Sequence, residues 1–170
     1  MSGRLKLLLV MPRGDRGYWG KVSKSGKAGL VRINLPFIAA LTPGDWDVEI
    51  HDSRVSPVDY SCKADLVGIT GFTSEIPHAY EVADNFRRRG VKVVMGGVHV
   101  SALPQEALRH ADAVVVGEAE LVWSGLLEDF KKGELKQLYR SERLCELKDM
   151  ARPRRELLDR SMYVSGFNTI

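Results

Sequence analysis

Short apolar runs that end at glycine constrain the fold of this chain more than any other feature. Val93–Met95 stops at the pair Gly96 and Gly97, and Ala113–Val116 stops at Gly117. Short β-branched runs bounded by glycine are typical of buried parallel strands whose carboxyl ends open into loops. Ligands of open α/β sheets bind at those carboxyl ends. The stretch around residues 92–120 therefore predicts both a pair of strands and the position of a binding site.

Apolar runs of this kind alternate with helical patterns along the chain. Strands are expected at Leu5–Met11, Trp46–Asp52, Asp65–Thr70, Val91–Met95 and Asp112–Val116, and a further short strand is compatible with Leu135–Tyr139. Helices are expected at Leu30–Leu41, Pro77–Arg89, Pro104–His110 and Glu120–Lys132. Pro36 lies inside the first of these helices and is expected to kink or restart it.

Five strands that alternate with helices predict a doubly wound, flavodoxin-like α/β fold with helices on both faces of a parallel sheet. The expected strand order is 2-1-3-4-5, with its switch point between strands one and three. Trp46–Asp52 is expected at the edge of the sheet because its second face is acidic. The polar stretch Arg13–Gly29 is expected to be a surface loop.

Charge is distributed unevenly along the 170 residues. Lys131–Arg160 contains ten Lys or Arg and six Asp or Glu, a surplus of four against a net charge of +3 for the chain. Interleaved acids and few aromatic residues favour a solvated linker over a nucleic-acid-binding surface. We therefore expect one domain at residues 1–140, a linker at 141–170, and no nucleic-acid partner.

Neither a membrane span nor an oxidising compartment is indicated by the sequence. No apolar run reaches the roughly 18 residues that a transmembrane helix needs. The short apolar run near the N-terminus predicts a strand and not a signal peptide. Cys62 and Cys145 match no metal or redox spacing, so we expect a cytoplasmic protein without a metal site of its own.

One edge of the predicted sheet collects the candidate binding residues. They are Pro12, Arg13, Gly14, Thr70, Gly71, Phe72, Thr73, Ser74, Gly96, Gly97, Val98, His99, Gly117 and Glu118. Paired glycines let a flat ligand approach the backbone, because no Cβ stands in the way. Free amides at the start of the helix after Ser74 suit an anionic or amide-rich group. A glycine pair taken alone is better explained by a turn, and the binding interpretation gains support because all the strand ends carry the same kind of edge. No residue of this set is expected to be catalytic.

Several common cofactor motifs are missing. The first strand continues into MPRGDRGYWG, which is not the GxGxxG of a dinucleotide-binding fold, and no GxxxxGK[ST] phosphate loop is present. A response regulator would carry an aspartate where Thr70 and Gly71 stand. Flavin mononucleotide remains open, because Ser23 and Ser25 could bind a phosphate in the loop after the first strand.

The central part of the chain resembles a known cofactor-binding domain. From ADLVGITGFTSE through GGVHVSALPQEAL to VVVGEAELVW it is similar to the cobalamin (vitamin B12)-binding domain that precedes the core of many radical S-adenosylmethionine (SAM) enzymes. That family includes the anaerobic magnesium-protoporphyrin monomethyl ester cyclase, hopanoid-modifying enzymes and methyltransferases. The likeness covers about Leu5–Tyr139, and Arg152–Leu158 resembles the segment that leads to the catalytic barrel. It implies a corrinoid at the sheet edge, with its nucleotide tail between strands one and three.

Two family features are absent. The CxxxCxxC motif that holds a [4Fe–4S] cluster and SAM does not occur, so those cofactors and any radical chemistry are expected only in a downstream barrel outside this chain. Cobalamin-dependent mutases carry DxHxxG after the first strand, whereas Asp15, Gly17 and Gly20 place glycine at the histidine position. His99 fits a polar lining residue better than a cobalt ligand. Glu118 fits a helix cap or an acceptor for a corrin amide.

Two alternatives to cobalamin binding stay open. In the first, the fold is retained without the vitamin and serves as an interaction domain. In the second, the domain carries flavin.

Overall fold

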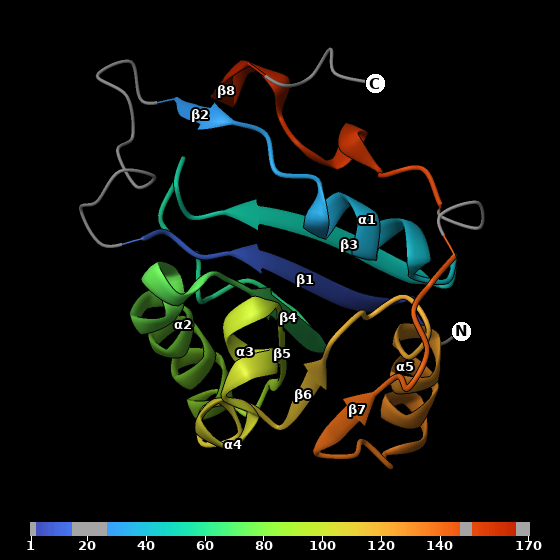
Figure 1. Ribbon diagram of the computed structural model, residues 1–170. Helices are drawn as coiled ribbons and strands as arrows, with labels where there is room; N and C mark the ends of the chain where they lie inside the picture. Colours follow the sequence, from blue (N-terminus) through green and yellow to red (C-terminus); the bar gives the residue numbers. More distant parts are fainter. Residues whose placement is uncertain (1–2, 15–26, 147–150, 166–170) are drawn as a thin grey trace.

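A six-stranded parallel sheet forms the centre of the protein (Figure 1). The computed structural model describes residues 3–14, 27–146 and 151–165. The strand order is β3-β1-β4-β5-β6-β7. The strands are β1 (Leu5–Met11), β3 (Trp46–Asp52), β4 (Leu66–Thr70), β5 (Lys92–Gly96), β6 (Ala113–Val116) and β7 (Leu138–Arg140). The predicted order of the five main strands is confirmed, and β3 lies at the edge as expected.

The sixth strand, β7, overlaps Leu135–Tyr139, the stretch compatible with a further short strand. β7 pairs with β6 through the partners Val114 and Leu138, and Val116 and Arg140. Its central residue, Tyr139, is buried, and the Tyr139 hydroxyl donates a hydrogen bond to Asp129 at 2.9 Å. This contact to the end of the preceding helix holds a strand of only three residues in place.

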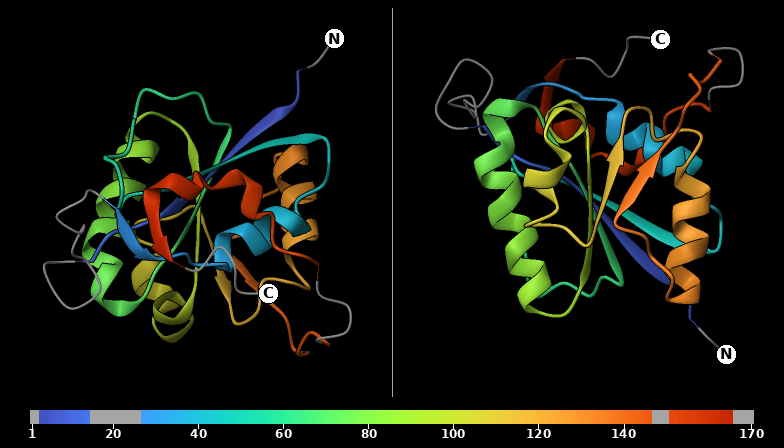
Figure 2. Two further views of the ribbon diagram at one scale, coloured as in Figure 1. Left: turned by 90° about the horizontal axis from the view of Figure 1, so that it is seen from above. Right: turned by 60° about the horizontal axis from the view of Figure 1, so that its bottom comes forward.

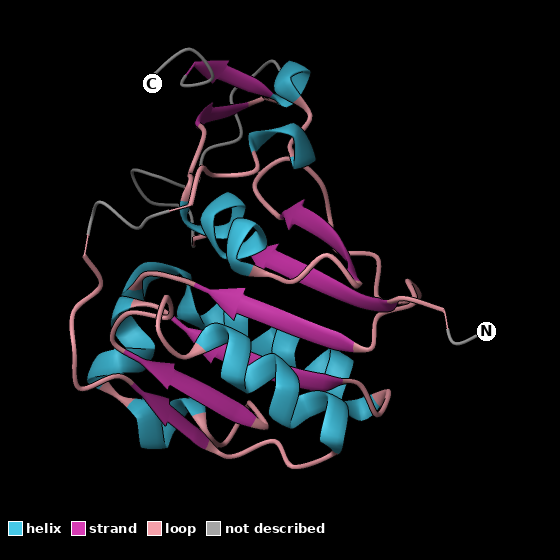
Figure 3. Ribbon diagram, turned by 90° about the vertical axis from the view of Figure 1, so that its right-hand side faces the viewer, coloured by secondary structure: helices cyan, strands magenta, loops and turns pink. Residues whose placement is uncertain are grey.

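Helices cover both faces of the sheet, as Figures 2 and 3 show. α1 (Asn34–Leu41) and α5 (Trp123–Lys132) pack on one face, and α2 (Ile76–Arg88), α3 (Val98–Ala102) and α4 (Pro104–Ala107) pack on the other. β1 illustrates why two cores form. Leu7 and Leu9 point into the core under α1 and α5, whereas Leu8 and Val10 point into the core under α2, because successive side chains of a strand face opposite sides.

The first helix begins later than the sequence predicts. Leu30 belongs to the short strand β2 (Ala28–Leu30), and the helix starts at Asn34. Pro36 therefore lies in the first turn, where backbone N–H groups have no partner within the helix, and the helix continues through it to Leu41. The helix predicted at Glu120 likewise begins at Trp123. The predicted Pro104–His110 helix is shorter, and α3 precedes it.

Part of the expected linker packs against the domain. β8 (Tyr163–Ser165) pairs in parallel with β2. Leu158 and Tyr163 are buried in the core under α1, and the backbone N–H of Arg154 donates to the carbonyl of Pro36 at 2.9 Å. Among the described residues, no helix combines the length and apolar character needed to cross a membrane.

Candidate functional site

A cavity of about 220 Å³ lies between the sheet and the layer formed by α1 and α5, next to the carboxyl ends of β4, β5 and β6. Its lining residues are Leu9, Asn34, Leu35, Phe37, Ile38, Gly68, Ile69, Thr70, Val94, Gly96, Gly97, Val115, Gly117, Glu118, Ala119, Glu120 and Trp123. Most of these side chains are apolar, and the sheet contributes several glycines to the wall. The cavity thus has the mixed character of a small-molecule site, apolar with a few polar groups.

Two of the wall glycines lie very close to neighbouring groups. A Cβ on Gly68 would lie 2.8 Å from Cδ2 of Leu9, a methyl group that can rotate away, whereas one on Gly97 would lie 2.6 Å from Oγ1 of Thr70 and 3.2 Å from the backbone carbonyl oxygen of Gly71. Gly97 also has φ of +100°, a conformation that side chains with a Cβ rarely adopt. A Cβ on Gly96, in contrast, would meet Val115 at an ordinary 3.6 Å. Glycine at position 96 therefore enlarges the cavity and is not a steric necessity.

Five of the predicted binding residues line this cavity: Thr70, Gly96, Gly97, Gly117 and Glu118. Phe72 and Val98 lie outside it, each just beyond a strand. Their side chains are 51% and 67% exposed. Because β4 and β5 are neighbours in the sheet, two exposed apolar side chains follow adjacent strand ends.

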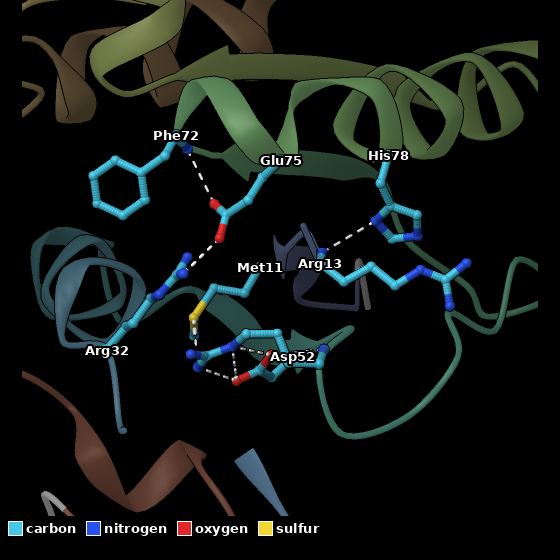
Figure 4. A network of polar contacts seen from close by, with 8 residues as sticks. Met11, Arg13, Arg32, Asp52, Phe72, Glu75 and His78 are labelled. Carbon is cyan, nitrogen blue, oxygen red and sulfur yellow. Dashed lines mark hydrogen bonds and ion pairs between the residues drawn. The ribbon is translucent and has the colours of Figure 1, made fainter. Parts of the chain in front are cut away.

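Other predicted residues join the loop after β1 to the loop after β4. A Cβ on Gly71 would lie 3.1 Å from Cγ of Pro12, and one on Gly14 would lie 3.5 Å from the carbonyl oxygen of Ser74. The backbone N–H of Arg13 donates to Nδ1 of His78, at the start of α2, at 3.2 Å (Figure 4). These residues shape the rim of the site and do not line the cavity.

An ion pair at this rim, between the buried Glu75 and the partly buried Arg32, was not predicted. Glu75 accepts a hydrogen bond from the backbone N–H of Phe72 at 3.0 Å, and its other carboxylate oxygen pairs with Arg32 at 2.5 Å. Arg32 also lies over the ring of Phe72, with Cζ 5.2 Å from the ring centroid. Figure 4 shows the three side chains together. Ser74 does not occupy the N-cap of α2: a 3-10 turn at Thr73–Glu75 precedes the helix, and Glu75 stands at the N-cap position.

His99 is buried and both of its ring nitrogens have protein partners. Nδ1 lies 3.2 Å from Oγ1 of Thr73, and Nε2 lies 3.3 Å from a carboxylate oxygen of Glu106. Tyr80 donates to the same oxygen of Glu106 at 2.9 Å. The hydrogen bonds from Tyr80 and His99 hold the pKa of Glu106 below its ordinary value. His99 thus connects neighbouring elements and does not line the cavity.

Glu118 has a partner that the sequence did not suggest. Its carboxylate accepts a hydrogen bond from the backbone N–H of Cys145 at 2.7 Å, and α5 has no side-chain cap. Asp15, Gly17, Gly20, Ser23 and Ser25, the candidates of the loop after β1, lie outside the described residues. Within the described part of the chain, no group of three or more His, Cys, Asp or Glu side chains is arranged to hold a metal ion.

Sequence reasoning missed the half of the cavity that the helices supply. Asn34, Phe37 and Ile38 come from α1, and Trp123 begins α5. Trp123 is fixed by a hydrogen bond from its indole N–H to Oγ1 of Thr42 at 2.9 Å. One signal was available: Gly68 is an isolated glycine within a β-branched strand, which indicates close approach of another group.

Comparison with known families identifies the domain. A model of the B12-binding domain matches residues 30–127, a range that contains every lining residue of the cavity except Leu9. The chain belongs to the B12-binding domain family.

The relatives of this B12-binding domain include named methyltransferases. The bacteriochlorophyllide d C-8(2)-methyltransferase of Chlorobaculum tepidum is 42% identical over 119 residues, which cover 69% of this chain and 26% of that protein. The bacteriochlorophyllide d C-12(1)-methyltransferase of the same organism is 33% identical over 155 residues, which cover 89% of this chain and 33% of that protein. The chain thus spans a quarter to a third of the length of these relatives.

Among solved structures, the N-terminal domain of a hypothetical protein from Thermotoga maritima aligns with a TM-score of 0.44 at 20% identity. The alignment covers 74% of this chain and 93% of that one.

Proposed function

We propose that this B12-binding domain holds a corrinoid at the carboxyl edge of its sheet, for methyl transfer completed by a radical SAM region of a longer parent protein. The observation that carries the proposal is the cavity with glycines in its wall, which lies almost wholly inside the matched range. A bound corrinoid would supply a cobalt that carries a methyl group. The residues of this chain would bind and orient it.

The size of the cavity fits part of such a ligand. At about 220 Å³ it is smaller than the roughly 300–1,000 Å³ of pockets that enclose a drug-sized molecule. It therefore suits a flat appendage, such as the nucleotide base of cobalamin, that inserts between the sheet and α1. The wall includes residues of β1 and β4, the first and third of the predicted strands, between which the nucleotide tail is expected. The macrocycle would then rest outside, where Phe72 and Val98 offer apolar surface.

The glycine wall supports insertion of a planar group. Gly96 and Gly97 expose backbone to the cavity, so that a ring can lie against the end of β5 without meeting a side chain. Asn34, at the start of α1, and Glu120, in the loop between β6 and α5, are polar lining residues of the cavity. They are placed to hydrogen-bond polar atoms at the margin of the inserted group.

The proposed reaction and substrate rest on the sequence similarity to the two methyltransferases. Two relatives are named for methylation of bacteriochlorophyllide d, so we infer a methyltransferase parent that acts on a chlorin-type ring. The [4Fe–4S] cluster and SAM would belong to the part of the parent outside these 170 residues, and that part would be the principal partner of the domain.

Cobalamin binding is tested with the purified chain, hydroxocobalamin and a desalting column. We expect the protein to retain the corrinoid and its visible absorbance. Gly96→Leu should weaken binding by about ten-fold or more, since its side chain enters the cavity, whereas Gly96→Ala adds only a Cβ at ordinary contact distance.

A colourless wild-type protein would contradict the proposal and leave the fold as an interaction domain. A yellow protein with flavin absorbance would favour the flavin alternative. Equal binding by both Gly96 variants would show that the cavity is not the binding site.

A further inference from the structure

The short helix α3 contacts the loops on both sides of it. Its residue His99 lies 3.2 Å from the hydroxyl of Thr73, in the loop after β4. Its residue Ser101 accepts a hydrogen bond at 2.9 Å from the backbone N–H of Gly117, in the loop after β6. Since α3 itself follows β5, five residues connect the carboxyl ends of three neighbouring strands.

The spacing of the two side chains explains how one helical turn reaches both loops. An α-helix has 3.6 residues per turn, so residues two apart project about 200° apart, toward nearly opposite sides. His99 and Ser101 have this separation. Gly97, with φ of +100°, turns the chain at the end of β5 and so sets the direction in which α3 leaves the sheet.

The side chain of His99 is buried and has hydrogen-bond partners that fix its orientation. Its side chain is 10% exposed, and its second ring nitrogen is engaged by Glu106 of α4. Tyr80 of α2 donates to the same carboxylate oxygen. A ring whose two nitrogens both have partners has a defined orientation, as for the histidines that are oriented by groups behind a functional site.

The two loops that α3 contacts carry groups that we expect to meet the corrinoid. Thr73 adjoins the exposed ring of Phe72, and Gly117 lines the cavity. Both Thr73 and Gly117 are exposed, and Gly117 has φ of +81°. Exposed loop backbone has little packing to fix its position, so each side-chain contact has a large share in holding it.

We propose that His99 and Ser101 are positioning residues, which fix the loops after β4 and β6 at the separation that the corrinoid requires. This inference rests on the proposed function. Neither residue needs to touch the cofactor. Each acts through the loop that it holds: His99 on the Thr73 side and Ser101 on the Gly117 side.

The first experiment measures amide hydrogen exchange in the cofactor-free protein. Ser101→Ala should speed exchange at Gly117 about ten-fold or more, because the amide loses its acceptor. His99→Gln, whose amide reaches the position of Nε2, should keep the Glu106 contact and release Thr73, so that exchange at Thr73–Glu75 rises. His99→Asn, whose amide reaches the position of Nδ1, should restore slow exchange there.

The matched control is Ser61→Ala, which also removes a single hydroxyl oxygen. Ser61 donates to Asp59 in the segment that precedes the amino end of β4, at the opposite edge of the sheet. This control should leave exchange in both loops at the wild-type rate. Unchanged exchange in Ser101→Ala and His99→Gln would overturn the positioning role, whatever the cofactor result. Ser101→Ala removes only one oxygen atom, so this variant still tests the positioning role if the histidine variants do not fold.

The second experiment measures hydroxocobalamin affinity of the same variants. Ser101→Ala and His99→Gln should each raise Kd about ten-fold, and His99→Asn should lie near the wild type. Faster loop exchange with unchanged Kd would show that the loops do not set the cofactor geometry, which overturns the inference while cobalamin binding stands. Wild-type protein that binds no corrinoid would count against the proposed function, and the exchange data would still decide whether α3 holds the loops.

Discussion

At the scale of single residues, a buried charge pair fixes the end of β3. Asp52 and Arg54 are 4% and 7% exposed, and the guanidinium of Arg54 contacts both carboxylate oxygens of Asp52. Tyr163 donates to the same carboxylate at 2.9 Å. Burial by itself lowers the pKa of Arg54, but its hydrogen bond and charge interaction with Asp52 outweigh that effect and raise it. Removing one partner would leave the other charge buried and unpaired.

Asp52→Asn should therefore lower the free energy of unfolding by about 3–5 kcal/mol. Guanidinium chloride unfolding of the wild type and the variant measures this difference. The control is Glu49→Gln, an exposed acid on the same strand, which should change stability by less than about 0.5 kcal/mol. Equal effects of the two substitutions would mean that the buried pair has no special role.

At the scale of elements, Glu106 connects α4 to α2 and α3. The hydrogen bonds from Tyr80 and His99 depress its pKa below the ordinary value of 4.5. A carboxyl group with a lowered pKa in the folded state stabilises the fold fully above its unfolded pKa, and this stabilisation is lost as the pH falls through the folded pKa.

Glu106→Gln keeps the shape of the side chain but replaces the carboxylate with a neutral amide that does not titrate. The urea midpoint of the wild type should exceed that of Glu106→Gln near neutral pH, and the gap should close as the pH falls below about 4.5. Unfolding curves over a pH series test this expectation. Glu81→Gln, an exposed acid on α2, is the control, and an identical pH trend in it would argue against a specific effect of Glu106.

At the scale of the whole molecule, the C-terminal segment contributes to the main core. Leu158 and Tyr163 are each 7% exposed and pack with residues of β1, α1 and α5. Burial of a large apolar side chain is worth about 1.5–3 kcal/mol. Residues 151–165 thus stabilise the domain although their sequence is that of a polar linker.

We expect a chain that ends after Arg140, at the expected domain boundary, to have a free energy of unfolding about 3–6 kcal/mol lower than that of the full chain, because these two buried side chains are lost. Leu158→Ala alone should cost about 2–5 kcal/mol. Denaturant unfolding of the three proteins gives the comparison. A shortened chain as stable as the full one would show that the segment is dispensable for the fold.

The strands, the doubly wound class and the edge at which glycines collect were predicted from sequence alone, because strand runs and the residues that interrupt them are local signals. The strand order followed from the general rule that alternating strands and helices wind in this way. Tertiary structure decided the rest. It paired Arg32 with Glu75, joined Asp52 to Tyr163, and placed α1 and Trp123 over the isolated Gly68 to form the cavity. These contacts join residues far apart in the chain, so no local pattern specifies them, and they depend on how the layers pack once the sheet has formed.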